Sequence, residues 1–113
     1  MTDSRIKTQI LDIIFGQVPK NDCVVFLFGS HATGDAIHSS DIDIGLLAKK
    51  SVPSRAFVEI QEQLNNDIST LQKIDIIDFS SVNEKIKTEA LKEIKIWHEG
   101  KNCRGLLKNL KRD

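Results

Sequence analysis

Two neighbouring stretches decide the fold, Cys23-Val-Val-Phe-Leu-Phe-Gly-Ser30 and Asp41-Ile-Asp-Ile-Gly-Leu-Leu-Ala48. The apolar run 23–28 is continuous and ends in glycine and serine, which predicts a strand that is buried on both faces. The second stretch begins with alternating carboxylates and isoleucines, and it predicts another strand over 41–48. Residues 29–40 hold two glycines and several small polar residues, so we expect a loop or a short helix there.

The turn after the first strand has the composition of an anion-binding site. Backbone N–H groups where a strand meets a loop or helix can point at one anion. Gly29 lets the backbone approach a phosphate closely, and the hydroxyl of Ser30 can bond a phosphate oxygen. We expect His31 and His38 to be ordinary loop residues. The residues expected to bind the phosphates of a cofactor are Gly29, Ser30, Thr33 and Gly34.

Two carboxylates begin the second strand. Asp41 and Asp43 are two residues apart, so the strand period of two places both on one face. Adjacent carboxylates repel each other unless a cation or a proton lies between them. Mg²⁺ is the natural cation, because it takes oxygen ligands from carboxylates, water and phosphate.

A third carboxylate is expected from residues 73–79, which predict a short strand. Asp75 and Asp78 are three residues apart and point to opposite faces, so only one of them can join the first pair. Asp75 lies between two isoleucines, where an unpaired charge would be costly to bury, and it is the better candidate. Asp78 is expected to be exposed or to cap the turn. Asp41, Asp43 and Asp75 are thus the predicted metal ligands and catalytic residues.

Three carboxylates that face a phosphate-binding turn indicate phosphoryl or nucleotidyl transfer with two metal ions. One ion would lower the charge on the attacking oxygen, and the other would hold the phosphates and stabilise the leaving pyrophosphate. Catalysis would rest mostly on positioning and on charge neutralisation.

Apolar residues at helical spacing predict helices around these strands. Isoleucines recur at this spacing over 4–16, and Gly16 with Pro19 would end that helix. Pro53 suits the first turn of a second helix, whose apolar face would extend over 57–71.

A last long helix is predicted after the third strand. The capping box Ser81-x-x-Glu84 would open it, and Gly100 would stop it. His98 would lie near its end, and its inner face would carry Ile86, Ala90, Ile94 and Trp97.

Length and composition describe one ordinary domain. The chain has 113 residues, of which 40% are apolar and 28% charged, so disorder and a second core are excluded. Sixteen basic residues balance sixteen acidic ones, so nucleic acid binding is not indicated, although a local basic patch stays open. We expect a catalytic domain over 1–100. The tail 101–113 carries five basic residues and one acidic residue, a net charge of +4, and is either a solvated helix or a docking segment.

Two observations bear on the compartment. No apolar run reaches the roughly eighteen residues that a membrane span needs, and the N-terminus has no signal-peptide pattern. Cys23 and Cys103 are far apart in the sequence and form no Cys-x-x-Cys pair, so reduced thiols are expected rather than a zinc site. We therefore expect a cytoplasmic protein that does not bind membranes.

Gly29-Ser30, ten intervening residues and Asp41-x-Asp43 together resemble the signature of the nucleotidyltransferase superfamily that includes DNA polymerase beta. The short chain is similar to the minimal nucleotidyltransferases of that superfamily, and Asp75 matches the position of their third carboxylate. The resemblance covers most of the chain. It implies an α+β fold, in which helices pack on a small mixed β-sheet of three or more strands. It also implies two Mg²⁺ ions and a nucleoside triphosphate, with ATP as the expected one.

The resemblance further implies a partner. Minimal members of the family often act with a separate small helical protein of the HEPN type, and in several toxin–antitoxin pairs they place AMP on a tyrosine of that partner. We expect the same reaction class here, from ATP to an acceptor hydroxyl. A protein tyrosine, an RNA end, an antibiotic hydroxyl and a small metabolite all stay open as acceptors. A homodimer through Trp97 and the tail also stays open.

One departure from the family pattern bears on activity. Many minimal members carry Arg where this chain has Thr33, and threonine cannot offer a charged fork to a phosphate. His31 or Lys73 could compensate. The departure is the best support for one alternative, a module that masks its partner without catalysis. A sensor that binds a nucleotide without transferring it is a further alternative.

Overall fold

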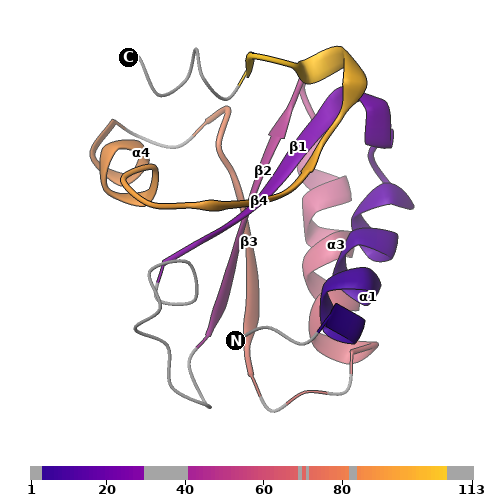
Figure 1. Cartoon of the computed structure of the whole chain (residues 1–113). Coiled ribbons are helices and arrows are strands. Elements are labelled where there is room, and N and C mark those ends of the chain that lie inside the picture. Colours follow the sequence, from indigo (N-terminus) through magenta and orange to yellow (C-terminus); the bar gives the residue numbers. More distant parts are fainter. Residues whose placement is uncertain (1–3, 30–40, 69, 71, 82–83, 107–113) are drawn as a thin grey trace.

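The computed structural model describes residues 4–29, 41–68, 70, 72–81 and 84–106 (Figure 1). Over these residues the chain forms α-helices, short 3₁₀ helices and strands. In chain order they are α1 (Ser4–Phe15), η1 (Lys20–Asp22), β1 (Cys23–Phe28), β2 (Ile42–Ala48), α3 (Ser54–Asn66), β3 (Ile74–Asp78), α4 (Glu84–Ala90), β4 (Lys95–Glu99) and η2 (Lys101–Cys103).

The strands form one mixed sheet in the order β3-β2-β1-β4. β2 pairs antiparallel with β1 and parallel with β3, and β4 pairs antiparallel with the other edge of β1. Helices α1 and α3 cover one face of the sheet, and α4 lies on the opposite side (Figure 1). The predicted α+β fold, a mixed sheet of three or more strands with helices packed on it, is confirmed.

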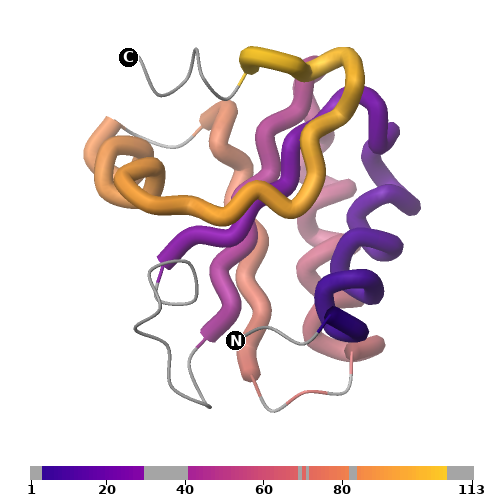
Figure 2. The backbone as a smooth tube through the Cα atoms, in the orientation of Figure 1, coloured from indigo at the N-terminus to yellow at the C-terminus, as the bar shows by residue number. Residues whose placement is uncertain are grey.

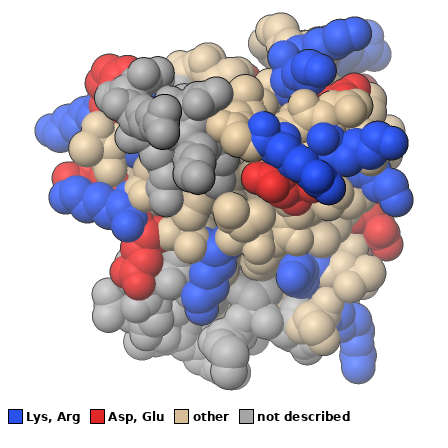
Figure 3. Space-filling model, turned by 45° about the horizontal axis from the view of Figure 1, so that its top comes forward, with Lys and Arg blue, Asp and Glu red and all other residues tan. Residues whose placement is uncertain are grey.

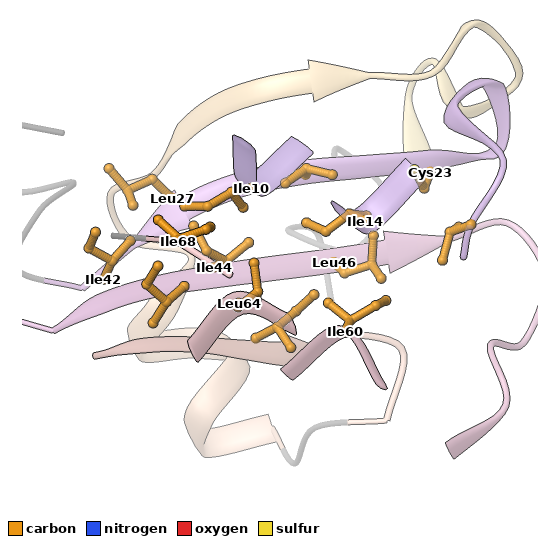
Figure 4. Packing of buried hydrophobic residues seen from close by; sticks show 14 residues of the cluster. Ile10, Ile14, Cys23, Leu27, Ile42, Ile44, Leu46, Ile60, Leu64 and Ile68 are labelled. Carbon is orange, nitrogen blue, oxygen red and sulfur yellow. The ribbon is translucent and has the colours of Figure 1, made fainter. Parts of the chain in front are cut away.

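The larger core cluster lies between the sheet and the pair α1 and α3 (Figure 4). Ile10 and Ile14 are one helical turn apart on α1, and Ile60 and Leu64 have the same spacing on α3. All four side chains are fully buried. Each contributes about 1.5–3 kcal/mol relative to an exposed position, so this face anchors both helices.

The second core cluster lies on the face that α4 covers. Phe26 of β1 and Phe79 after β3 pack edge to face, with ring centroids 4.8 Å apart. A Cβ at Gly45 of β2 would lie 2.3 Å from the ring of Phe26, so only glycine leaves room for that ring. The centre of the sheet is therefore covered by buried apolar side chains on both faces.

Five of the predicted elements are confirmed. The helix expected over 4–16 is α1, and the strand over 23–28 is β1. The strand expected over 41–48 begins one residue later, at Ile42. The helix after Pro53 ends at Asn66, before the buried Ile68. The strand expected over 73–79 is β3.

The predicted last long helix is wrong. Helix α4 has seven residues, and the chain then turns into strand β4. The hydroxyl of Ser81 donates to the carbonyl oxygen of Asp78, in the turn after β3. The expected inner residue Ile86 is 47% exposed. Lys87 is buried instead, with its Nζ 3.0 Å from Glu84 Oε1.

The reason for this difference is tertiary. Without β4, the outer edge of β1 would expose unpaired backbone N–H and C=O groups, and pairing satisfies them. Ile96 and Trp97, which precede His98 in β4, favour strands over helices, although apolar spacing alone cannot reveal this. Two of these side chains point toward α1. Trp97 packs on the larger cluster with Lys7 Nζ 5.7 Å from its ring, and His98 meets the ring of Phe15 at 4.8 Å.

Strand β4 and η2 lead back beside the start of β1 and η1 (Figure 2). Gly100 donates to the carbonyl oxygen of Cys23 at 2.8 Å, and Cys103 is buried in the second cluster. Both cysteines are free thiols, as expected. Burial, reinforced by Cys103 and Asp22, raises the pKa of the Cys23 thiol to about 11. Of the expected tail, residues 107–113 lie outside the described part of the chain.

Two further surface observations concern membranes and charge. No helix in the described ranges is long and apolar enough to cross a membrane. Figure 3 shows Lys and Arg side chains gathered toward one side of the face in view, with acidic side chains among them.

Candidate active site

The candidate site lies at the end of the sheet where β1 stops and β2 begins. Asp43 is the register partner of Phe28 in β1 and of Asp75 in β3. Residues that are directly opposite on adjacent strands point to the same face. The sheet therefore brings the carboxylates of Asp43 and Asp75 to one face, the one that α4 partly covers, and both residues are half-buried.

Gly29 directly follows β1, and its backbone lies close to the carboxylate of Asp43. Its φ is +75°, in the region that favours glycine. A Cβ at this position would lie 2.5 Å from Asp43 Oδ2, so the backbone approaches the carboxylate more closely than any side chain would allow. The glycine expected to admit a phosphate is thus next to the carboxylate expected to hold the metal.

Asp75 is held by its strand and by a polar clamp from α3. Gln61 donates from Nε2 to the carbonyl oxygen of Ile74, and its Oε1 accepts from the N–H of Ile76 at 3.0 Å. These bonds cover the outer edge of β3 on both sides of Asp75 and satisfy groups that would otherwise be unpaired. Lys73 Nζ lies 3.8 Å from Asp75 Oδ1 and is 65% exposed. That pair contributes little to stability, but it places a cation beside the carboxylate.

Asp41 lies just before strand β2 and is exposed. The strand begins at Ile42, whose N–H donates to the carbonyl oxygen of Lys73 at 2.8 Å. Among the described residues, no three His, Cys, Asp or Glu side chains are close enough together to hold a metal ion. The structure thus joins Asp43 with Asp75 and does not gather all three predicted ligands.

Two carboxylates still fit Mg²⁺. This ion is commonly bound by one or two carboxylates, with phosphate oxygens and water supplying the remaining ligands. Asp43 and Asp75 offer such a donor set beside a backbone that leaves room for a phosphate at Gly29.

Asp78 has the alternative role that its position predicted. Its Oδ1 accepts from the N–H of Ser80 at 3.0 Å and from the Ser80 hydroxyl at 2.6 Å. The side chain therefore caps the turn after β3. Ser30, Thr33 and Gly34, together with His31 and His38, lie outside the described residues.

Two features were missed from the sequence. One is the clamp from Gln61, which a polar residue on a helix surface does not reveal. The other is a groove between the end of β1 and α4 that begins at Gly29. Both depend on how helices are placed on the sheet. The groove could have been expected only if the short length of α4 had been known, because that length leaves Ile86 exposed to solvent.

Comparison with solved structures finds the same fold in toxin–antitoxin complexes. A toxin–antitoxin complex with AMP-PNP has a TM-score of 0.72 at 22% identity, and the match covers 92% of this chain and 82% of that chain. The complex of a tri-AMPylated Shewanella oneidensis HEPN toxin with its MNT antitoxin has a TM-score of 0.70 at 19% identity, covering 96% and 79%. The MntA–HepT toxin–antitoxin complex gives 0.71 at 19%, covering 97% and 81%.

Comparison with known families agrees with the fold and with the motif. No curated protein matches the chain. Residues 14–101 match the family described as polymerase beta, nucleotidyltransferase, and this range holds Gly29, Asp41, Asp43 and Asp75. The matched residues are well over half of the chain, which therefore belongs to the polymerase beta nucleotidyltransferase family.

Proposed function

We propose that this protein is the catalytic subunit of an Mg²⁺-dependent nucleotidyltransferase that moves AMP from ATP to an acceptor hydroxyl on a separate helical partner. The observation that carries the proposal is the contact of Gly29 with Asp43, together with the register pairing of Asp43 and Asp75. A phosphate at Gly29 would lie next to both carboxylates.

The expected residue roles follow from these positions. Asp43 and Asp75, joined by Asp41, would hold two Mg²⁺ ions, which lower the charge on the attacking oxygen and neutralise the phosphates when bound. Gly29 and Ser30, with Thr33 and Gly34, would bind the phosphates of ATP. The chain's own work is to orient the triphosphate and to hold the ions in place.

The reaction exchanges the phosphoanhydride bond between the α- and β-phosphates of ATP for a phosphodiester bond to the acceptor. The acceptor oxygen forms a bond to the α-phosphorus, and the bond from that phosphorus to the oxygen that bridges to the β-phosphate breaks. Pyrophosphate leaves with the bonding electrons. Asp75 would take the proton of the acceptor hydroxyl, because the strand register places its carboxylate beside Asp43 on the same face of the sheet.

The choice of partner rests on similar structures. An MNT antitoxin of the same fold is bound to a tri-AMPylated HEPN toxin, and a related toxin–antitoxin complex contains AMP-PNP. By analogy, we propose a HEPN-type helical protein as partner and a hydroxyl side chain of that partner as acceptor.

The test compares two isotopic forms of ATP. The protein is incubated with Mg²⁺, a lysate of the source cells and ATP labelled at either the α- or the γ-phosphate. Nucleotidyl transfer predicts an acceptor labelled only from the α-position, with the signal lost in EDTA. Label from the γ-position would mean phosphoryl transfer, and no label from either would overturn the proposal.

A second function is favoured by one observation, that no three His, Cys, Asp or Glu side chains of the described residues are grouped closely enough to hold a metal ion. A subunit with an incomplete metal site could neutralise its partner by masking it. In that case Asp43→Asn would leave both complex formation and neutralisation unchanged, whereas a catalytic antitoxin would lose neutralisation with the same substitution.

A further inference from the structure

A groove of about 630 Å³ lies between the end of β1 and helix α4. It is within the size range of small-molecule sites. Its walls come from two segments that are distant in the sequence, the end of β1 and one surface of α4. That surface of α4 carries Ile86 and Ala90, which the sequence predicted to face the core. The lining residues are Phe28, Gly29, Lys85, Ile86, Glu89, Ala90, Lys92 and Glu93.

The chemistry of the groove suits a flat, uncharged group. Phe28, Ile86 and Ala90 make its apolar part, and Ile86 is 47% exposed although it belongs to a helix that packs on the sheet. Among the described lining residues, the charged ones are two lysines and two glutamates, which balance. One of these lysines is already paired, with Lys92 Nζ 3.1 Å from Glu89 Oε1. Such a lining does not favour a polyphosphate.

The groove is continuous with the candidate active site through one residue. Gly29 lines the groove and also touches Asp43. In a nucleoside triphosphate, the ribose and base follow the α-phosphate directly. A triphosphate that is held at Gly29 and Asp43 therefore has its base within reach of Phe28 and α4.

We infer that this groove holds the base of the nucleoside triphosphate, with Ile86 and Phe28 against the ring. The inference rests on the proposed function, because it takes the triphosphate to lie at Asp43. It adds a base-binding surface built from β1 and α4. Apolar contact with a base does not depend on the base's hydrogen-bonding edge, so this surface contributes affinity more than it selects among purines.

The experiment uses the full chain and isothermal titration calorimetry in the presence of Mg²⁺. ATP and inorganic tripolyphosphate are titrated separately into wild type, Ile86→Asp and Val58→Asp. Val58 is the matched control, because it is a 56% exposed branched residue on α3, outside the groove. Ile86→Asp is expected to weaken ATP binding about tenfold by removing apolar contact. Tripolyphosphate binding should stay unchanged, which also reports that the variant is folded. Val58→Asp should change neither.

Several results would overturn the inference. Wild-type affinity for ATP in Ile86→Asp would mean that the base lies elsewhere. If that variant kept its ATP affinity but labelled the acceptor more slowly, the groove would hold the acceptor instead. Equal loss of affinity for ATP and for tripolyphosphate would mean that Ile86 acts on the phosphate site and not on the base. Wild type that binds neither ligand would refute the proposed function itself, whereas wild type that binds both with an unaffected Ile86→Asp would refute only the groove.

Discussion

The backbone at Gly29 approaches Asp43 so closely that a Cβ there would lie 2.5 Å from the Asp43 Oδ2 oxygen. A strand end, a glycine with positive φ and a carboxylate of the neighbouring strand are thereby fixed in one place. The residue type at position 29 consequently determines where the Asp43 carboxylate can lie.

Gly29→Ala should displace Asp43 and reduce nucleotidyl transfer about a hundredfold, the scale on which an ångström of misplacement acts. Gly105→Ala is the matched control. Its φ is +84° and no heavy atom lies within 4 Å of the Cβ that it would gain, so it carries only the conformational cost of about 1 kcal/mol. Gly29→Ala should lose more stability in urea than Gly105→Ala, because it adds the clash with Asp43 to the same conformational cost. Equal transfer rates for the two would contradict this account of Gly29.

Asp75 is assigned to the candidate site, whereas Asp78 caps the turn after β3, and substitutions can distinguish the two roles. Asp75→Asn should reduce transfer at least about a hundredfold with little change in the midpoint of urea unfolding, since the amide keeps the shape but not the charge. Asp78→Ala should lower the free energy of unfolding by about 1 kcal/mol, because two hydrogen bonds to Ser80 are lost, and leave transfer nearly intact. The assignment of Asp75 is refuted if Asp78→Ala is the variant that loses transfer.

Gln61→Met should loosen the strand that carries Asp75. The substitution keeps the length of the side chain but removes both hydrogen bonds to the edge of β3, at a cost of about 2 kcal/mol in the free energy of unfolding. Gln63→Met on the exposed surface of the same helix is the control, and it should change stability by less than about 0.5 kcal/mol. Urea unfolding measures both. Equal losses for the two variants would argue against the clamp.

The fold was predictable where the pattern is local and strong. The continuous apolar run at 23–28, the isoleucines of α1 and the spacing around Ile60 each give one element, and the structure has all three. The boundary between α4 and β4 was not predictable in this way. Ile86, Ala90, Ile94 and Trp97 have helical spacing, and only the open edge of β1 converts the end of that segment into a strand.

In the candidate site, too, the features that follow from local pattern were predictable and those that depend on helix placement were not. A period of two along each strand predicts the face of Asp43 and of Asp75, and the register of β2 and β3 makes them neighbours. The edge clamp from Gln61 and the groove under α4 depend on how helices are placed, and local spacing carries no such information. The position of Asp41 was predicted only in part. The alternation of carboxylates and isoleucines placed it in the strand, but β2 begins one residue later, at Ile42.

The raised pKa of the Cys23 thiol should make the free energy of unfolding depend on pH. Its pKa is raised from 9.0 to about 11 in the folded protein, chiefly by burial, so the folded state favours the neutral thiol. The resulting contribution is complete below pH 9 and is lost as the pH rises toward 11, by roughly 2–3 kcal/mol in total. Cys23→Ala should flatten that part of the unfolding free-energy curve. The chain has no tyrosine, so the part of the thiolate absorbance that is lost in Cys23→Ala reports the titration of Cys23 rather than that of Cys103. Parallel curves for wild type and variant would contradict the prediction.

The central claim, that Asp43 serves nucleotidyl transfer and not only the fold, is tested most directly by Asp43→Asn with ATP labelled at the α-phosphate. Wild type and variant are compared at equal concentration, with Mg²⁺ and the purified helical partner, after circular dichroism has verified equal folding. We expect label on the partner with wild type, a loss of at least about a thousandfold with Asp43→Asn, and an unchanged complex between variant and partner. Equal labelling of the partner by the two proteins would contradict the central claim.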